Sequence, residues 1–156
     1  MGVRLSEDEA WRELEAAHTG ILTTLRRDGW PVSLPVWFAA VDRRIYVRTP
    51  AKTKKVARVR HDPRGTFLVE RGEKWIDLCA VMVTGPIDVV EDDDEYRAAL
   101  AAIDRKYEGY GMAQEKVPDA TRDHYRGRSA LLRLSPEGRL ITWDNSRLRL
   151  DAGEGR

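Results

Sequence analysis

A basic segment in the first third of the chain is the strongest candidate for chemistry. Between Arg48 and Arg60 the sequence has six basic residues and no acidic one, namely Arg48, Lys52, Lys54, Lys55, Arg58 and Arg60. We expect a strand to end at Thr49 and a helix to begin near Ala51 or Lys52. A helix start presents free backbone N–H groups and the positive end of the helix dipole. With the hydroxyls of Thr49 and Thr53 added, the segment predicts an anion-binding site.

The spacing within this segment divides its cations into two groups. Val56 and Val59 should face the core, so the residues beside them can reach into a cleft. Those residues are Lys52 and Lys55. Lys54 and Arg58 are expected to lean outward into solvent. A solvated basic helix that binds nothing fits the same pattern equally well.

Other reactive side chains give no recognisable motif. The three histidines, His18, His61 and His124, are far apart in the sequence, and no zinc-type spacing of His or Cys occurs. Cys79 lies in an apolar β-prone stretch, which favours a buried structural thiol over a nucleophile. The acidic run 91–95 lacks the alternation of a calcium loop and is better placed to cap a helix. We therefore predict no metal site and assign no catalytic residue.

Composition limits the classes of protein that remain. The chain has 156 residues, which suits a single domain over 1–150 followed by a flexible tail over 151–156. Its net charge of +1 provides no overall field for nucleic acid. No apolar run approaches the roughly 20 residues that span a bilayer. One cysteine and an N-terminus without a signal pattern favour the cytoplasm.

The periodicity of apolar residues predicts a mainly β protein with flanking helices. Helices are expected over 6–18, where Ser6 and Glu9 form a capping box, over the basic segment, over 94–107 and over 119–126. Strands are expected over 20–25, 32–39, 45–48, 66–70, 74–90, 129–134 and 139–143, with a bend at Gly85-Pro86. Pro31 and Pro35 mark the second of these as an edge strand or as the site of a bulge, where a ligand can reach backbone groups. Six or seven antiparallel strands in hairpin order favour a barrel.

Two stretches resemble those of the pyridoxamine-phosphate-oxidase-like superfamily. Residues 46–55, Tyr-Val-Arg-Thr-Pro-Ala-Lys-Thr-Lys-Lys, followed by Pro63, resemble its phosphate-binding stretch. Residues 28–38, Asp-Gly-Trp-Pro-Val-Ser-Leu-Pro-Val-Trp-Phe, are similar to its flavin-contacting strand. Residues 132–136 and Trp143-Asp144 resemble the closing strands of its deazaflavin-dependent branch. The resemblance implies a six- to seven-stranded antiparallel split β-barrel of the FMN-binding type.

The resemblance also implies roles for individual residues. The residues expected to hold the cofactor phosphate are Thr49, Thr53, Lys54 and above all Lys55, with help from Arg48 and Lys52. The residues expected to run past the cofactor ring are Ser33, Leu34, Pro35, Val36 and Trp37. In this family the cofactor lies between two subunits, so we expect a homodimer. Trp75 and Trp143 could then contact the ring or the substrate from the partner chain, although ordinary core burial is an alternative for both.

The preferred function is a reductase that binds coenzyme F420 and passes a hydride to a small, conjugated, electrophilic substrate. One alternative is an FMN-dependent oxidoreductase on the same fold. Another is a non-enzymatic module that holds an anionic ligand, a tetrapyrrole or nucleic acid. Vitamin B6 oxidation is not expected, since Arg147-Leu148-Arg149 lacks the histidine of the substrate motif. Arg58 and Gly65 depart from the deazaflavin pattern, and the substrate mouth could be formed by Trp75, by Trp143 or by the loop 108–118.

Overall fold

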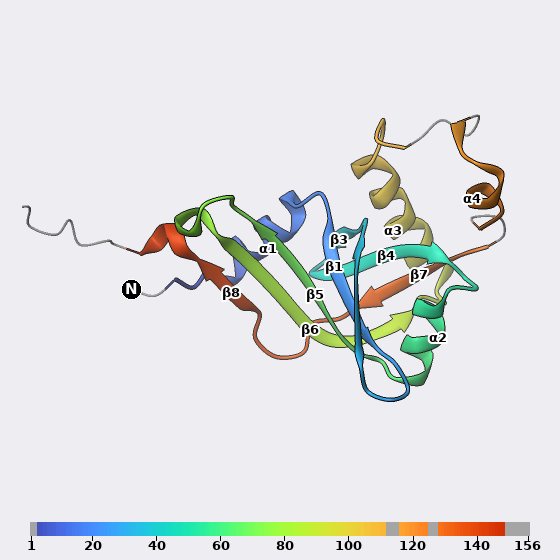
Figure 1. Ribbon diagram of the computed structural model, residues 1–156, viewed down its shortest axis with the longest axis horizontal. Helices are drawn as coiled ribbons and strands as arrows, with labels where there is room; N and C mark the ends of the chain where they lie inside the picture. Colours follow the sequence, from blue (N-terminus) through green and yellow to red (C-terminus); the bar gives the residue numbers. More distant parts are fainter. Residues whose placement is uncertain (1–2, 112–115, 125–127, 149–156) are drawn as a thin grey trace, which may run out of the picture.

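The computed structural model describes residues 3–111, 116–124 and 128–148. Within these residues eight strands form one antiparallel sheet that curls into a half-barrel (Figure 1). The strands are β1 (Gly20–Leu25), β2 (Pro31–Val36), β3 (Ala39–Val41), β4 (Arg44–Pro50), β5 (Arg64–Arg71), β6 (Cys79–Val89), β7 (Ser129–Leu134) and β8 (Ile141–Asp144). Their order is β2-β1-β5-β6-β7-β4-β3, with β8 beside β6. The predicted mainly β, split-barrel class is confirmed, with one strand more than expected. The predicted tail 151–156 lies outside the described residues.

Strand β6 joins the two halves of the barrel. Its first part pairs with β5 and β8, and residues 87–89 pair with β7. The change of partner follows Gly85-Pro86, which confirms the predicted bend (Figure 1). A Cβ atom at Gly85 would lie 1.9 Å from the carbonyl oxygen of Ser135, so this crossing of chains requires glycine. One half therefore contains β1, β2, β5 and β8, and the other contains β3, β4 and β7.

The described residues also contain four helices. They are α1 (Glu7–Ala16), α2 (Lys54–His61), α3 (Asp93–Lys106) and α4 (Asp119–His124), with 3-10 turns at Trp75–Asp77 and Asn145–Arg147. The capping box of Ser6 and Glu9 at the start of α1 is confirmed. Helix α1 packs against β3 and β6, α2 against β1 and β6, and α3 against β3 and β4. No helix in the described part of the chain is long and apolar enough to cross a membrane.

Apolar side chains on the inner faces of the strands make the core. Phe38 and Phe67 are fully buried, with ring centroids 4.6 Å apart. Val56 and Val59 of α2 join the same cluster, as their spacing predicts. A second cluster lies beneath α3 and includes Ile103. Burial of these faces fixes the positions of β2 and α2, which carry most of the predicted site.

Three predicted boundaries are wrong, each for a tertiary reason. The expected strand 32–39 breaks at Trp37-Phe38, because the Phe38 N–H donates to the hydroxyl of Tyr107 instead of to a neighbouring strand. Residues 75–77 form a 3-10 turn rather than a strand, and the side chain of Asn145 donates to the Trp75 carbonyl. Helix α2 begins at Lys54, later than predicted, because Thr53 has the extended backbone of an N-cap.

Candidate cofactor site

Strand β2 has a free edge, as its two prolines predict. It is the end strand of the sheet, and within residues 3–111, 116–124 and 128–148 it pairs only with β1. The Arg26 N–H donates to the Trp30 carbonyl, so Arg26 and Trp30 form a hydrogen-bonded pair. Opposite residues in an antiparallel ladder alternate between hydrogen-bonded and non-hydrogen-bonded pairs, which makes Thr23 and Ser33 a non-hydrogen-bonded pair. Ser33 therefore directs its N–H and carbonyl away from β1, between two prolines that have no N–H. At the free edge, the Ser33 N–H is therefore a backbone donor with carbonyl acceptors on both sides.

The side chains of β2 point to two different faces. Leu34 lies opposite Leu22 and shares the inner face of the sheet, yet it is 40% exposed because β2 extends past the core. Ser33 and Pro35 point to the outer face, where the Ser33 hydroxyl lies 2.8 Å from that of Thr23. The predicted ring-contacting stretch thus presents Leu34 as an apolar surface and Ser33 through its backbone. Val36 is buried.

Trp37, the last residue of that stretch, packs against aromatic side chains of its own chain. Its indole stacks on Tyr107, with ring centroids 4.2 Å apart and planes 3° from parallel. The Tyr107 hydroxyl also donates to the His18 carbonyl at 2.7 Å. His18 lies against Trp37, Tyr107 and the exposed Tyr110. These contacts hold the end of β2 to the C-terminus of α3.

The start of α2 has the features of an anion site. The hydroxyls of Thr49 and Thr53 are 3.2 Å apart, and Thr53 makes no side-chain cap to the helix. The first turn of α2 has no acidic residue. Lys55 is partly buried, and burial, followed by the nearby charge of Arg58, lowers its pKa. A bound anion would relieve both effects. Lys52 and Lys54 are exposed around the same turn.

Two of the predicted residues lie apart from this cluster. Arg48 projects from the opposite face of β4 to Thr49, and its guanidinium contacts Ser129 at 3.3 Å and Asp104 at 3.4 Å. Trp75 lies in the β5–β6 connection, at the end of the sheet remote from α2 (Figure 1). Of the predicted residues, those of β2 form one group and those at the start of α2 form another, and Arg48 and Trp75 belong to neither.

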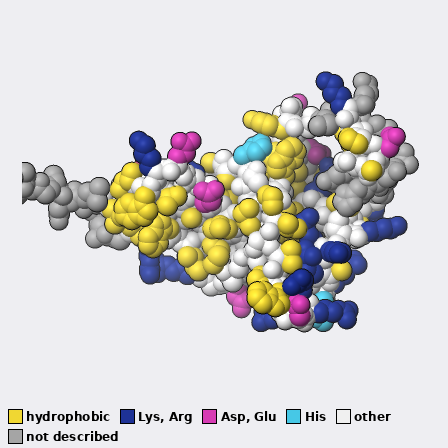
Figure 2. Space-filling model, in the orientation of Figure 1, with side chains coloured by type: hydrophobic (Ala, Val, Ile, Leu, Met, Phe, Trp, Pro, Cys, Tyr) yellow, Lys and Arg dark blue, Asp and Glu magenta, His cyan; other side chains and the backbone are white. Residues whose placement is uncertain are grey.

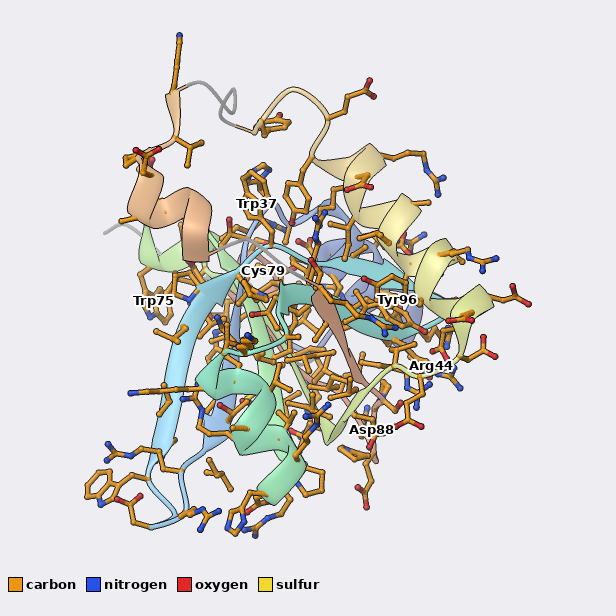
Figure 3. The ribbon with its side chains drawn as sticks, turned by 90° about the vertical axis from the view of Figure 1, so that its right-hand side faces the viewer. Trp37, Arg44, Trp75, Cys79, Asp88 and Tyr96 are labelled. Carbon is orange, nitrogen blue, oxygen red and sulfur yellow. The ribbon has the colours of Figure 1, made fainter. Side chains whose placement is uncertain are left out.

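The expectation that Arg58 leans outward is wrong. Its Nε–H donates to the Thr24 hydroxyl of β1 at 2.7 Å, and Thr24 is buried. Helix α2 is thereby fixed against the β1–β2 hairpin, and the two lie side by side in Figure 3. The three-residue spacing from Lys55 to Arg58, which puts both on one helix face, is the sequence signal that could have shown this.

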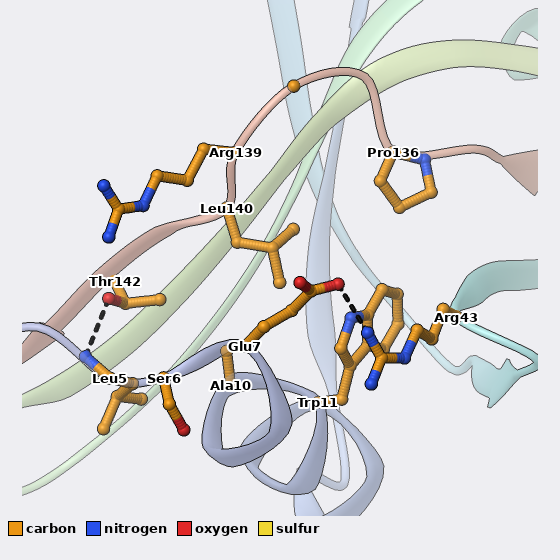
Figure 4. Close-up of a pocket in the computed structure, with 11 residues that line it drawn as sticks. Leu5, Ser6, Glu7, Ala10, Trp11, Arg43, Pro136, Arg139, Leu140 and Thr142 are labelled. Atoms are coloured by element: carbon orange, nitrogen blue, oxygen red, sulfur yellow. Dashed lines mark hydrogen bonds and ion pairs between the residues drawn. The ribbon is translucent and has the colours of Figure 1, made fainter.

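Other features of the surface are less suited to catalysis. A cavity of about 510 Å³ lies between α1, the β3–β4 hairpin and the β7–β8 loop (Figure 4). Two of its charged lining residues pair with each other, with Arg43 2.6 Å from Glu7. Cys79 is buried, which raises the pKa of its thiol and agrees with a structural role. The described residues contain no group of three or more metal-ligating side chains.

A hydrophobic patch covers the end of the sheet near β8 (Figure 2). Its exposed members are Trp75, Leu78, Ile141, Trp143 and Leu148. Asn145, which is fully buried, accepts a hydrogen bond from the Trp143 indole and donates to the Trp75 backbone. The patch is therefore built on a fixed framework, and Trp75 and Trp143 are not core residues of the single chain.

Comparison with solved structures identifies the architecture. The conserved hypothetical protein Rv2991 of Mycobacterium tuberculosis aligns with TM-score 0.77 and 27% identity over 92% of this chain and 88% of that one. An FAD-binding protein of Mesorhizobium loti aligns with TM-score 0.66 and 20% identity over 88% and 94%. HutZ, the heme storage protein of Vibrio cholerae, aligns with TM-score 0.67 and 15% identity over 92% and 96%.

Sequence comparison identifies the family. No curated protein matches the chain. The family model for pyridoxamine 5'-phosphate oxidase matches residues 6–139, which is well over half of the sequence. The chain therefore belongs to the pyridoxamine 5'-phosphate oxidase family.

Proposed function

We propose that this protein is an oxidoreductase that binds a flavin or deazaflavin phosphate between the edge of β2 and the start of α2. The preferred cofactor is coenzyme F420, and FMN is the alternative. The observation that carries the proposal is the partly buried Lys55 beside the Thr49–Thr53 hydroxyl pair, on a helix fixed to the β1–β2 hairpin. That cation has no carboxylate partner among the described residues.

The residues on the two sides of this proposed cofactor groove fit such a cofactor chemically. A phosphate would accept hydrogen bonds from the two hydroxyls, the Lys55 ammonium and the uncapped N–H groups of the first helical turn. The fused ring of a flavin or deazaflavin has apolar faces and a pyrimidine edge that both donates and accepts hydrogen bonds. Leu34 offers an apolar surface for the ring, and the Ser33 N–H and carbonyl can pair with that edge.

The chain would orient the cofactor and shield it from water. When bound in reduced form, the cofactor supplies a hydride to the electrophilic carbon of a conjugated substrate, and solvent supplies the accompanying proton. Trp37, held in place by its stack on Tyr107, limits the groove at the end of β2. The geometry thus supports hydride transfer by positioning, without a dedicated acid or base.

We further propose a homodimer in which a second copy covers the hydrophobic patch. Exposed apolar areas of this kind on a soluble chain are typical of interfaces. Trp75 and Trp143 lie far along the sheet from α2, so they can reach a cofactor only from the partner subunit. Light scattering after gel filtration tests this: a monomer of 17.8 kDa for the parent protein would contradict the dimer.

Cofactor titration followed by tryptophan fluorescence tests the function. Saturable binding of F420 in preference to FMN would support the deazaflavin enzyme, and the reverse would favour the flavin alternative. Replacing Lys55 with alanine removes a charge-assisted hydrogen bond and should weaken binding roughly 10- to 100-fold. Arg60→Ala is the matched control, because Arg60 is an exposed cation of the same helix that lines a different cavity, together with Glu95 and Arg133. Unchanged affinity in Lys55→Ala would disprove the assignment.

A further inference from the structure

A row of cations continues from Lys55 along α2 to the β1–β2 hairpin. The hydrogen bond to Thr24 carries the Arg58 side chain onto the face of the hairpin. Burial lowers the pKa of Arg58, and the charge of Arg26 lowers it further. Arg58 in turn lowers the pKa of Lys55. Each of these cations therefore lies close enough to the next to repel it.

Carboxylates do not neutralise this row. Across the described residues, no Asp or Glu lies within salt-bridge distance of Lys55 or Arg58, and Arg26 meets only the exposed Asp28 at 3.5 Å. Arginines elsewhere on the barrel form shorter ion pairs with carboxylates, such as the pair of Arg71 with Glu13 at 2.7 Å. Lys55 and Arg58 are therefore like charges in partly buried positions without an acid, an arrangement that favours binding of an anion, and Arg26 adds an exposed cation beside them.

The row lies on the same face as the predicted ring-binding surface. Thr24 is opposite Val32, and Arg26 is opposite Trp30, so strand alternation puts these residues on the inner face with Leu34. Trp30 is 66% exposed at the tip of the hairpin. Cationic and aromatic groups thus extend the groove beyond the position proposed for the cofactor phosphate.

We propose that Arg58 and Arg26 form a second anionic subsite, which binds an anionic group of the cofactor beyond its first phosphate. The inference rests on the proposed cofactor groove and specifies its ligand: a flavin or deazaflavin with an extended anionic tail, bound more tightly than FMN. Two sources provide that chemistry, the second phosphate and adenosine of FAD, or the carboxylate tail of F420. Trp30 can stack on an adenine, whereas a carboxylate chain has no ring to stack.

Dissociation constants for FMN, FAD and F420 test the subsite. In Arg58→Gln, affinity for FAD or F420 should fall at least fivefold, while affinity for FMN changes less than twofold. Arg26→Gln should act in the same direction. Arg60→Gln, an equal loss of charge on the same helix, should leave all three affinities unchanged. Arg58→Lys keeps the charge and should retain most of the tail-dependent affinity.

The possible outcomes separate this inference from the proposed function. Equal loss of FMN, FAD and F420 affinity in Arg58→Gln would place Arg58 at the first phosphate and overturn the second subsite. Unchanged affinities would overturn it as well, with the cofactor groove intact. If the parent protein binds none of the three, both proposals fail. Where the subsite holds, the cofactor that the parent protein binds more tightly, FAD or F420, identifies the occupant, and loss of FAD affinity with unaltered F420 affinity in Trp30→Leu would show that Trp30 stacks on the adenine.

Discussion

Tyr107 is a structural link between three segments, and removing its hydroxyl should measurably destabilise the barrel. The hydroxyl accepts the Phe38 N–H at 2.9 Å and donates to the His18 carbonyl at 2.7 Å. Tyr107 is 6% exposed and Phe38 is fully buried, so water cannot replace the lost acceptor. In Tyr107→Phe the stack on Trp37 is kept, and only these hydrogen bonds are lost.

The expected cost follows from the burial of the Phe38 N–H. An unsatisfied buried donor costs about 1–3 kcal/mol, whereas the His18 carbonyl, nearer to solvent, loses little. We expect a loss of about 2 kcal/mol in the free energy of unfolding, or roughly 4–8 °C in Tm for a domain of this size. Urea denaturation followed by circular dichroism measures it. Tyr110→Phe is the control, because Tyr110 is 64% exposed and should change stability by less than about 0.5 kcal/mol.

A small effect in Tyr107→Phe would refute this reasoning. Stability within about 0.5 kcal/mol of the parent protein would mean that the Phe38 N–H finds another acceptor, and that the break between β2 and β3 does not depend on Tyr107. The same variant should weaken cofactor binding if Trp37 positions the ring, because the end of β2 would then be held by the stack alone.

Two further changes test the packing around the site. Burial lowers the pKa of Lys106 to about 8, while the Phe38 ring 3.6 Å away favours the charged form and offsets part of the penalty. Because the folded state binds this proton less tightly than the unfolded state, stability should rise with pH from about 8 to about 10.5. Lys106→Met should remove that rise and gain about 1–2 kcal/mol near pH 7, as measured by urea denaturation across pH. Gly85→Ala should cost at least about 2 kcal/mol in thermal or urea unfolding, because its Cβ would lie 1.9 Å from the Ser135 carbonyl oxygen. Gly111→Ala, where a Cβ meets open space, should be neutral, and equal effects of the two glycine changes would contradict the close-approach argument.

Local patterns predicted the parts of the fold that depend on neighbouring residues. The capping box at Ser6, the core face of α2 and the bend at Gly85 follow from spacing or from backbone chemistry within a few residues. The edge position of β2 follows from its prolines. The grouping of hydroxyls and lysines at the start of α2 was likewise predictable, because these residues lie within one short segment.

Contacts between distant segments were not predictable in this way. The break after β2 depends on Tyr107, which is 69 residues from Phe38. The inward turn of Arg58 depends on Thr24, 34 residues away. The 3-10 turn at Trp75 is held by Asn145, 70 residues away. A single sequence gives no register between such segments, so an outward-leaning Arg58 and a continuous strand were the default expectations.

The same long-range contacts explain why the proposed cofactor groove lies where the barrel is split. Strand β4, which leads into α2, belongs to one half of the sheet, whereas β1 and β2 belong to the other. The two halves share strand β6, and α2 crosses between them with Arg58 bonded to Thr24. A cofactor with its phosphate at Lys55 and its ring along Ser33 would contact both halves at once. Its affinity would then depend on how the two halves are placed relative to one another, which the shared strand β6 and the packing of Val56 and Val59 of α2 in the core determine.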